Sequence, residues 1–323
     1  VNEATEGWNL VSNPYAAAIN VSDFLTENPN LEGAVYIWDD NGPGRGSNAD
    51  YIVANGTVAT NTTEAGGQTR YNQALGTAQG FFIKLKDDSD TEVSFTEEMR
   101  LKIKNLDASF FRSASVPAFS RINLTNTEGL FKQTIVGWVS GISDEDVDRT
   151  FDARVFSASA SDMIYTMKGG ALLAIQGMSY SREVVSLGLN IAAEGYFTIA
   201  VDDSLAQGQE LYLRDKLTEE IVNLNNESYS FSSDAGVFTE RFELLTAHKV
   251  LGAESSLLQV YAYDQTLVVN LPDGEVSDMR LVTLSGKQVF SRQVKGSARI
   301  ELSLPAGVYI VSIGGQSHKI ILK

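Results

Sequence analysis

The pattern that most constrains this chain is an alternation of apolar and polar residues with a period of two. Near the C-terminus, Ile300, Leu302 and Leu304 alternate with polar residues. Such alternation is typical of a half-buried β-strand, because successive side chains of a strand point to opposite faces. No long segment has the 3.6-residue period of an amphipathic helix. The sequence therefore predicts an all-β fold.

Similar runs recur along the chain, and each predicts a strand. They are residues 34–38, 80–85, 91–95, 171–175, 196–200, 210–213 and 307–313. The run 307–313 is apolar on both faces, so we expect it to lie between two layers. Turn residues separate the later runs at short, regular spacing. This spacing favours antiparallel β-sandwich modules of jelly-roll or immunoglobulin-like type in tandem, ending in a small immunoglobulin-like sandwich.

One short helix is predicted, over residues 21–26. Ser22 or Asp23 is expected to cap its N-terminus, because short polar side chains accept hydrogen bonds from the unpaired backbone N–H groups there.

The distribution of charge divides the chain. The 323 residues include 25 Lys and Arg against 41 Asp and Glu, a net charge of −16. Residues 274–323 hold seven Lys and Arg against three acids, which leaves 18 against 38 for the remainder. Such a change of sign suggests separate domains. We expect a β-rich module at 1–115, a β-sandwich module at 116–246 that can also fold as one unit with the first, a linker at 247–256 and a C-terminal domain at 257–323.

Composition excludes several classes of function. The absence of Cys excludes disulfide scaffolds, Cys-ligated metals and thiol catalysis. A net charge of −16 disfavours nucleic acid as a partner. The two histidines, His248 and His318, have no hydrolase or zinc-protease motif around them. We therefore expect no enzyme activity, and no cofactor other than calcium.

The two ends of the chain bear on its place in a cell. No apolar run approaches the length of about 18 residues that a membrane-spanning helix needs. The first residues lack a basic segment followed by an apolar run, which a signal peptide would have. Either a signal peptide has been removed or the chain is the C-terminal part of a longer protein; we expect the second, because residues 7–10 are predicted to form the first strand of a module.

Acidic and aromatic residues offer two candidate binding sites. Asp39, Asp40 and Asn41 cluster hard oxygen ligands, as calcium requires, although no twelve-residue calcium loop is present and solvated acidic turns are the more common case. Residues 144–148 form a second, weaker acidic cluster. The three tryptophans, Trp8, Trp38 and Trp138, lie in or beside strand patterns, where a tryptophan more often fills a core than stacks on a sugar.

Three short motifs follow one another at the C-terminal end. They are MRLVTLSGKQV at 279–289, LPAGVYIV at 304–311 and SHKIILK at 317–323. A small β-sandwich would need many of these residues for its fold alone. Pro305 and Gly307 are expected to make a tight turn, Val308 and Ile310 to fill a core, and Gly286 to adopt a backbone conformation that other residues resist.

Together the three motifs resemble the type A C-terminal sorting domains of cargo proteins of the type IX secretion system of Bacteroidota. The matching residues are Gly286, Lys287, Pro305, Ala306, Gly307, Val308, Tyr309, Lys319 and Lys323. Thr283 departs from the family, which often has an aromatic residue, Asn or Asp there. The resemblance implies three partners: an outer-membrane translocon barrel, an outer-membrane shuttle protein and a cell-surface sortase. It also implies cleavage near residues 248–256.

Upstream segments resemble large surface proteins exported by the same system. GWNLVSNPY at 7–15 is similar to an opening found in those proteins, and LYLRDK at 211–216 recurs in them. The segment around Ser204 resembles a glycosylation sequon of these bacteria. The resemblance implies an exported protein at the cell surface or outside the cell, with adhesive or structural β-modules that bind a glycan or a surface. The alternative is a carbohydrate-binding region of a secreted polysaccharide-degrading enzyme whose catalytic domain lies outside this chain.

Overall fold

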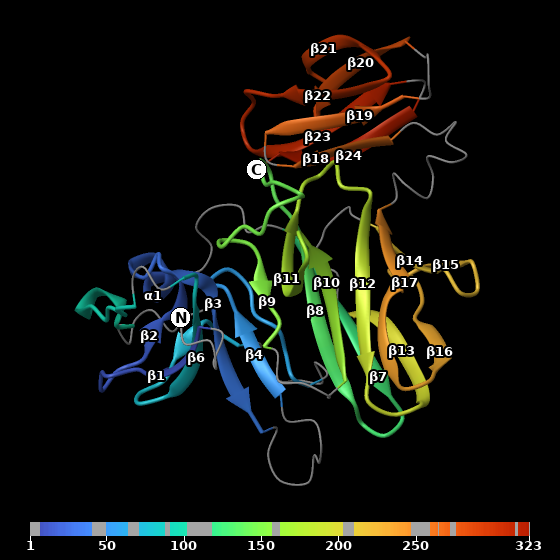
Figure 1. Cartoon of the computed structure of the whole chain (residues 1–323). Helices are drawn as coiled ribbons and strands as arrows, with labels where there is room; N and C mark the ends of the chain where they lie inside the picture. The colour runs from blue at the N-terminus through green and yellow to red at the C-terminus, as the bar shows by residue number, and fades with distance from the viewer. Residues whose placement is uncertain are drawn as a thin grey trace. The chain divides into compact units, whose positions relative to one another are not determined.

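The structure, a computed structural model, consists almost entirely of β-strands (Figure 1). It describes residues 7–40, 50–63, 71–87, 91–101, 118–156, 162–202, 210–246, 259–263, 265–271, 276–313 and 316–322. The predicted all-β fold is confirmed. The chain separates into two compact units, Val1–Thr246 and Ala247–Lys323, which we call the first and second units. In the part of the chain that is described, no helix has the length and apolarity needed to cross a membrane.

A four-stranded antiparallel sheet in the order β1-β6-β3-β4 begins the first unit. Its strands are β1 (Trp8–Ser12), β3 (Leu31–Asp39), β4 (Asp50–Ala54) and β6 (Gly80–Leu85), and the short β2 (Ile19–Asn20) pairs separately with β5 (Ala74–Leu75). One face of the sheet packs on helix α1 (Val21–Glu27) and the 3-10 helix η2 (Glu97–Met99), with Phe24, Val35 and Ile83 fully buried between them. The strands predicted at 34–38 and 80–85 are confirmed.

Helix α1 is capped by Asn20, whose side-chain oxygen accepts a hydrogen bond from the backbone N–H of Asp23 at 3.1 Å. The prediction of Ser22 or Asp23 as the cap is therefore wrong. An N-cap residue needs an extended backbone. Asn20 has one, with φ −82° and ψ 132°, whereas Ser22 and Asp23 already lie within the helix.

The strand predicted at 91–95 is also absent from the structure. Val93 and Phe95 do pack on the apolar core beside α1, so the alternating pattern has a physical cause. Side chains, and not a neighbouring strand, bond this backbone. Asn28 accepts from the N–H of Ser94 at 2.7 Å and donates to its carbonyl oxygen at 2.9 Å.

The remainder of the first unit is an 11-stranded sheet in the order β15-β14-β17-β12-β10-β11-β8-β7-β13-β16, with β9 paired to β11. The strands are β7 (Ala118–Asn126), β8 (Phe131–Trp138), β9 (Ala153–Arg154), β10 (Met163–Lys168), β11 (Ala171–Met178), β12 (Val184–Ile191), β13 (Gly195–Asp202), β14 (Leu211–Asp215), β15 (Glu220–Asn223), β16 (Tyr229–Ser233) and β17 (Gly236–Thr246). The strands predicted at 171–175, 196–200 and 210–213 are confirmed. The pair of β8 and β11 is parallel, which departs from the predicted antiparallel pattern.

This large sheet folds over on itself to form a sandwich. Phe197 from β13 and Leu213 from β14 come from opposite ends of the strand order, yet they belong to one buried core with Phe242. A separate core joins the two sheets of the first unit, because Tyr36 of the four-stranded sheet packs with Ile175 of the large one. Figure 1 shows the four-stranded sheet and α1 on one side of the first unit and the large sheet on the other.

The second unit is a small sandwich of two antiparallel sheets. One is β18 (Gln259–Tyr263), β19 (Thr266–Asn270) and β22 (Ser297–Glu301); the other has the order β21 (Gln288–Lys295), β20 (Val276–Thr283), β23 (Gly307–Ile313) and β24 (Gln316–Leu322). Leu267 and Val269 from the first sheet and Leu281 and Val311 from the second lie in one core. This unit therefore has its own hydrophobic core.

Strand β23 is buried on one face only, so the prediction that it lies between two layers is wrong. Tyr309, Val311 and Ile313 are buried in the core, whereas Val308 and Ile310 are half-buried on the opposite face. The expectation that Val308 and Ile310 fill the core fails for the same reason. The apolar run correctly predicts a strand, but Val308 and Ile310 lie on the face of β23 that is turned away from the core.

Candidate functional site

The three C-terminal motifs, which are separated in sequence, lie in one sheet of the second unit. Strand β20 carries the first motif, its partner β23 the second, and β24 the third. Cross-strand pairing places Thr283 opposite Tyr309, and Ile310 opposite Lys319. The fold thus places the predicted sorting-signal residues on β23 and β24 and in the segments that lead into β21 and β23, except Lys323, which lies outside the described residues.

The turn between β20 and β21 is built around Gly286. Its φ of 83° lies in the left-handed region, as predicted, and nothing lies within 4 Å of where a side chain would begin. The N–H of Gly286 donates to the carbonyl of Thr283 at 2.9 Å, and the N–H of Lys287 donates to Thr283 Oγ1 at 3.2 Å. Thr283 thereby offers the turn a side-chain acceptor, as an Asn or Asp at this position would.

The segment from Pro305 to Tyr309 is held by the tyrosine. The Tyr309 hydroxyl donates to the carbonyl of Pro305 at 2.7 Å while its ring is 6% exposed in the core. This contact is similar to the tyrosine corner of β-sandwiches. The chain only bends at Ala306 before β23 begins at Gly307, so the tight turn predicted for Pro305 and Gly307 is replaced by an open bend.

The described surface of the second unit is basic. Six cationic side chains are exposed: Arg280, Lys287, Arg292, Lys295, Arg299 and Lys319. The exposed acids among the same described residues are Asp278 and Glu301. The signature residues Lys287 and Lys319 therefore belong to a larger positive surface.

A fully buried ion pair lies in the first unit. Lys168 on β10 donates to Asp152 at 2.8 Å, and neither side chain is exposed. Asp152 also accepts the N–H groups of Gly177 and Asp148, each at 2.7 Å. Burial raises the pKa of the Asp152 carboxyl, and the hydrogen bond from Lys168 opposes this shift. Because no solvent reaches either side chain, we assign this pair to the fold and not to chemistry on a substrate.

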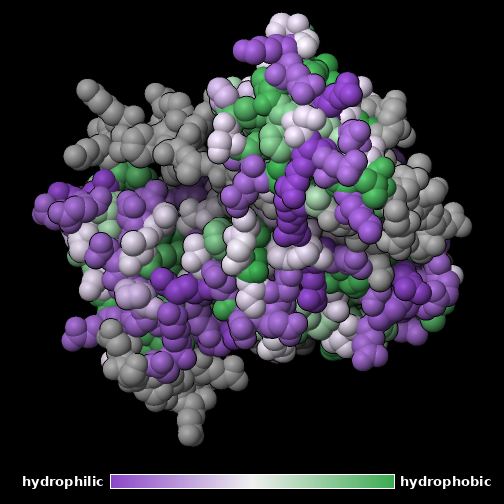
Figure 2. Space-filling model, turned by 90° about the horizontal axis from the view of Figure 1, so that it is seen from above, coloured by the Kyte–Doolittle hydropathy of each residue, from purple (hydrophilic) through white to green (hydrophobic). Residues whose placement is uncertain are grey.

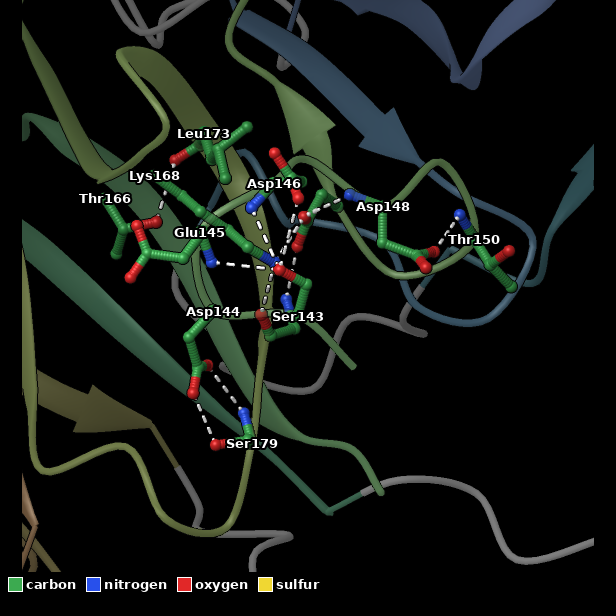
Figure 3. Close-up of polar contacts among 12 residues, drawn as sticks. Ser143, Asp144, Glu145, Asp146, Asp148, Thr150, Thr166, Lys168, Leu173 and Ser179 are labelled. Atoms are coloured by element: carbon green, nitrogen blue, oxygen red, sulfur yellow. Dashed lines mark hydrogen bonds and ion pairs between the residues drawn. The ribbon is translucent and has the colours of Figure 1, made fainter. Parts of the chain in front are cut away.

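The acidic loop before this pair bonds to its own backbone and to β11's C-terminal end (Figure 3). Ser143 Oγ accepts from the N–H of Asp146 at 3.2 Å, and Asp148 accepts from the N–H of Thr150 at 2.8 Å. Asp144 points toward Ser179 and accepts both its N–H and its hydroxyl. These carboxylates already serve as hydrogen-bond acceptors, and within the described ranges no three Asp, Glu or His side chains gather to hold a metal.

The calcium hypothesis at Asp39, Asp40 and Asn41 stays a prediction. Asp39 is half-buried and accepts the hydroxyl of Thr62 at 2.6 Å, and Asp40 is exposed. Asn41 lies outside the described residues, as does the predicted glycosylation residue, Ser204.

The three tryptophans occupy different environments. Trp138 is 1% exposed and belongs to the core of the large sandwich, as expected. Trp8 is half-buried, with its ring centroid 4.6 Å from that of Phe156. Trp38 is 54% exposed, so the expectation that it fills a core is wrong. It lies near the end of β3 and contacts the ring of Tyr51 at 5.0 Å.

Among the described residues, Trp38 and Tyr196 are exposed aromatic side chains. Figure 2 shows a face on which hydrophilic residues predominate and hydrophobic residues form small, scattered groups. No local sequence pattern predicts the pairing of Trp38 with Tyr51, because strand register decides it. The pairing of Asp152 with Lys168 was missed for the same kind of reason.

These observations define an all-β protein of two units whose second unit carries the C-terminal motifs. The chain belongs to the family described as a domain of unknown function, DUF8693, whose model matches residues 1–245. This match ends next to the boundary of the first unit at Thr246. No curated protein matches the chain. Among solved structures, one described as "Biofilm associated protein - BSP domain" is 13% identical, with a TM-score of 0.18; the match covers 98% of this chain and 59% of that one.

Proposed function

We propose that this chain is the C-terminal part of a protein exported to the cell surface, and that its second unit is the export signal. The observation that carries this proposal is that all three sorting-domain motifs gather in one sheet of a separate unit. The family match, which stops at residue 245, supports a different origin for the two units. In this proposal the first unit is an adhesive or structural module with no catalytic step of its own.

The second unit offers two features that an export partner could recognise. Among the described strands, β24 is the last in the order of its larger sheet and pairs with β23, so a strand added by a partner is one way in which it could be recognised. The exposed lysines Lys287 and Lys319 add positive charge to the same sheet. The proposed partners are the type IX translocon barrel, the shuttle protein and the sortase, and the linker at 247–256 would be the cleavage site.

Deletion of residues 304–323 tests the proposal. The deletion removes β23 and β24, and with them half of the sheet that carries the signal. In a host with a type IX system, we expect the truncated protein to accumulate in the periplasm, while the full chain with the same leader reaches the medium or the cell surface. Cell fractionation and immunoblotting measure this. Unchanged secretion of the truncated protein would refute the assignment.

A second variant separates recognition from folding. Lys287 and Lys319 are both exposed, so the double change Lys287→Glu and Lys319→Glu leaves the core intact. We expect reduced export with an unchanged melting temperature. Lys295→Glu is the matched control, because Lys295 is an exposed lysine outside the signature. Equal export of both variants and the wild type would argue against recognition through these lysines.

A second candidate function, carbohydrate binding by the first unit, is favoured by one observation. Trp38 is 54% exposed and its ring is supported by Tyr51. A large aromatic side chain that is held in place at the surface is a common element of ligand-binding surfaces. Binding of the purified chain to a panel of polysaccharides tests this function, and failure to bind any of them would exclude it for the panel used.

A further inference from the structure

We propose that the outer face of β20, β23 and β24 docks on a partner protein whose matching surface is apolar at its centre and acidic at its rim. The docking surface, which we call the aliphatic strip, consists of Val282, Val308, Ile310 and Ile321. This inference rests on the proposed export role of the second unit, because it names the surface through which that unit would be recognised.

Strand register places the four side chains next to one another. Val282 of β20 pairs with Ile310 of β23, and Val308 of β23 pairs with Ile321 of β24. Val308 and Ile310 lie two residues apart on one strand and therefore share a face. Because the side chains of directly opposed residues are neighbours in a sheet, the strip is continuous across three strands.

The aliphatic strip lies on the face of the sheet that is turned away from the core. Tyr309 and Val311 of β23 belong to the hydrophobic core of the second unit, whereas the residues of the strip do not. Ile321 is 48% exposed, and the other three strip residues are half-buried. Apolar area that a partner could cover is therefore present at the surface of this unit.

The apolar character is confined to one part of this face. Ser291, Gln293 and Lys295 of β21 share the face, because Ser291 pairs with Arg280, which lies two residues before Val282 on β20. These three residues of β21 are polar and exposed, as expected of a sheet face in water. The strip departs from that pattern, and an apolar patch bordered by polar residues is typical of a protein interaction site.

Cationic side chains border the aliphatic strip. Lys319 lies opposite Ile310, and Arg280 shares the face with the strip; both are exposed. The acid of β20, Asp278, lies two residues beyond Arg280 and accepts a hydrogen bond from Gln293 at 3.2 Å. The border of the strip is therefore positive. Complementary charge at the rim of an interface then calls for Asp and Glu on the partner.

The shape of the strip favours a protein over a membrane as its partner. Its residues are all Val or Ile, whose side chains branch at Cβ and are stiff. Segments that bind a membrane interface commonly use Trp, Phe or Leu. A sheet face of short, branched side chains instead suits packing against another protein surface.

The first test compares polar substitutions in the full chain, produced in a host with a type IX system. We expect Ile321→Asn to lower the amount of exported protein about five-fold or more, because it places an amide in the apolar centre of the interface. Val276→Asn is the matched control. Val276 is 51% exposed on β20, six residues from Val282 and therefore about 20 Å along the strand. This variant should be exported like the wild type.

The second test probes the partner itself by photo-cross-linking in the same host. The photoreactive amino acid p-benzoylphenylalanine takes the place of Ile321 in one variant and of Val276 in the other. We expect a covalent product with another protein from position 321 and none from position 276. Mass spectrometry of the cross-linked peptide should find Asp or Glu residues beside the joined position.

The outcomes separate the aliphatic strip from export itself. If the wild type is exported and Ile321→Asn is exported equally well, the strip is overturned while the export proposal stands. If the wild type is not exported, the export proposal fails and the strip with it. A cross-link to lipid, to a second copy of this chain or to a peptide without acidic residues would contradict an acidic protein partner, as would no cross-link at all. Equal melting temperatures show that Ile321→Asn is folded; if it melts lower, the cross-link decides.

Discussion

Gly33 shows how strongly a single residue can depend on a distant part of the chain. It lies in β3 with a φ of 86°, and a Cβ at this position would overlap the carbonyl oxygen of Arg149. Arg149 in turn donates hydrogen bonds to the carbonyls of Leu25 at 2.8 Å and Asn28 at 3.1 Å, where α1 ends. The backbone of Arg149, in the loop before β9, therefore lies so close to β3 that only glycine fits at position 33.

We expect Gly33→Ala to destabilise the protein more than the same change at Gly141. Gly141 also has a positive φ, of 76°, but nothing lies within 4 Å of its added Cβ. The change at Gly141 should cost about 1 to 2 kcal/mol from backbone strain alone. The change at Gly33 adds a clash with backbone and should cost about 2 to 5 kcal/mol in total.

Urea unfolding of the two variants and the wild type, followed by circular dichroism, measures the difference. Equal losses of stability in Gly33→Ala and Gly141→Ala would show that the contact between Gly33 and Arg149 is not made in solution.

At the scale of elements, a hydrogen-bond network around one ion pair connects strands from the two ends of the large sheet. Asp215 at the end of β14 accepts hydrogen bonds from Arg241 on β17 at 2.7 Å and from the hydroxyl of Tyr229 on β16 at 3.0 Å. The guanidinium of Arg241 lies 4.9 Å from the ring centroid of Phe231. Because β14 lies next to β15 at one end of the strand order and β16 lies at the other end, the hydrogen bond from Tyr229 to Asp215 helps to hold the sandwich closed.

The same network predicts a dependence of stability on pH. Burial alone would raise the pKa of Asp215, but hydrogen bonds from Arg241, Leu217 N–H and Tyr229 outweigh it and hold the pKa below its ordinary value. A carboxyl with a lowered pKa stabilises the fold above the pKa of the unfolded chain, about 3.9, and this stability is lost as the pH falls through the folded pKa. We expect Asp215→Asn to cost about 3 kcal/mol at neutral pH, because Arg241 loses its partner.

The variant should also lose less stability than the wild type as the pH falls below about 4, since it lacks the titrating group. Asp234→Asn is the control, because Asp234 is exposed on the loop between β16 and β17. Parallel curves of unfolding free energy against pH for Asp215→Asn and the wild type would contradict the role given to Asp215.

A strand can be predicted from the sequence where its own residues show the pattern of burial, but not where contacts with distant segments decide its structure. Alternation predicts β6 and β14 because the side chains of each strand alternate between a buried and a less buried face. It fails at 91–95, where Asn28 replaces the neighbouring strand, and at β23, where an apolar residue such as Ile310 faces outward. The parallel pairing of β8 with β11 is set by the path of the chain, which no local pattern contains.

The candidate sites follow the same rule. The resemblance of the C-terminal motifs to a sorting domain could be seen in the sequence because the motifs are short and contiguous, and the sorting role itself stays a prediction. The exposure of Trp38 and its contact with Tyr51 could not, since they depend on the register of two strands and on where the packing between the sheets ends. The buried pair of Asp152 and Lys168 likewise results from distant segments that meet only in the folded chain.

At the scale of the whole molecule, the two units differ in charge and in their match to the family model. The family model covers residues 1–245, within the first unit, and the second unit has a separate core and a basic surface. Residues 274–323 hold seven Lys and Arg against three acids, whereas the rest of the chain is strongly acidic. These differences agree with the export proposal, in which the first unit acts at the cell surface and the second unit is the export signal.

Transfer of the second unit to another protein tests the central claim most directly. Residues 247–323 are fused to a periplasmic passenger that is otherwise retained, and the fusion is produced in a host whose type IX system exports its own cargo. The account predicts that the passenger appears on the cell surface or in the medium, and that it stays inside in a strain without the translocon. Retention of the fusion in the periplasm of the competent host, with the second unit intact, would contradict it.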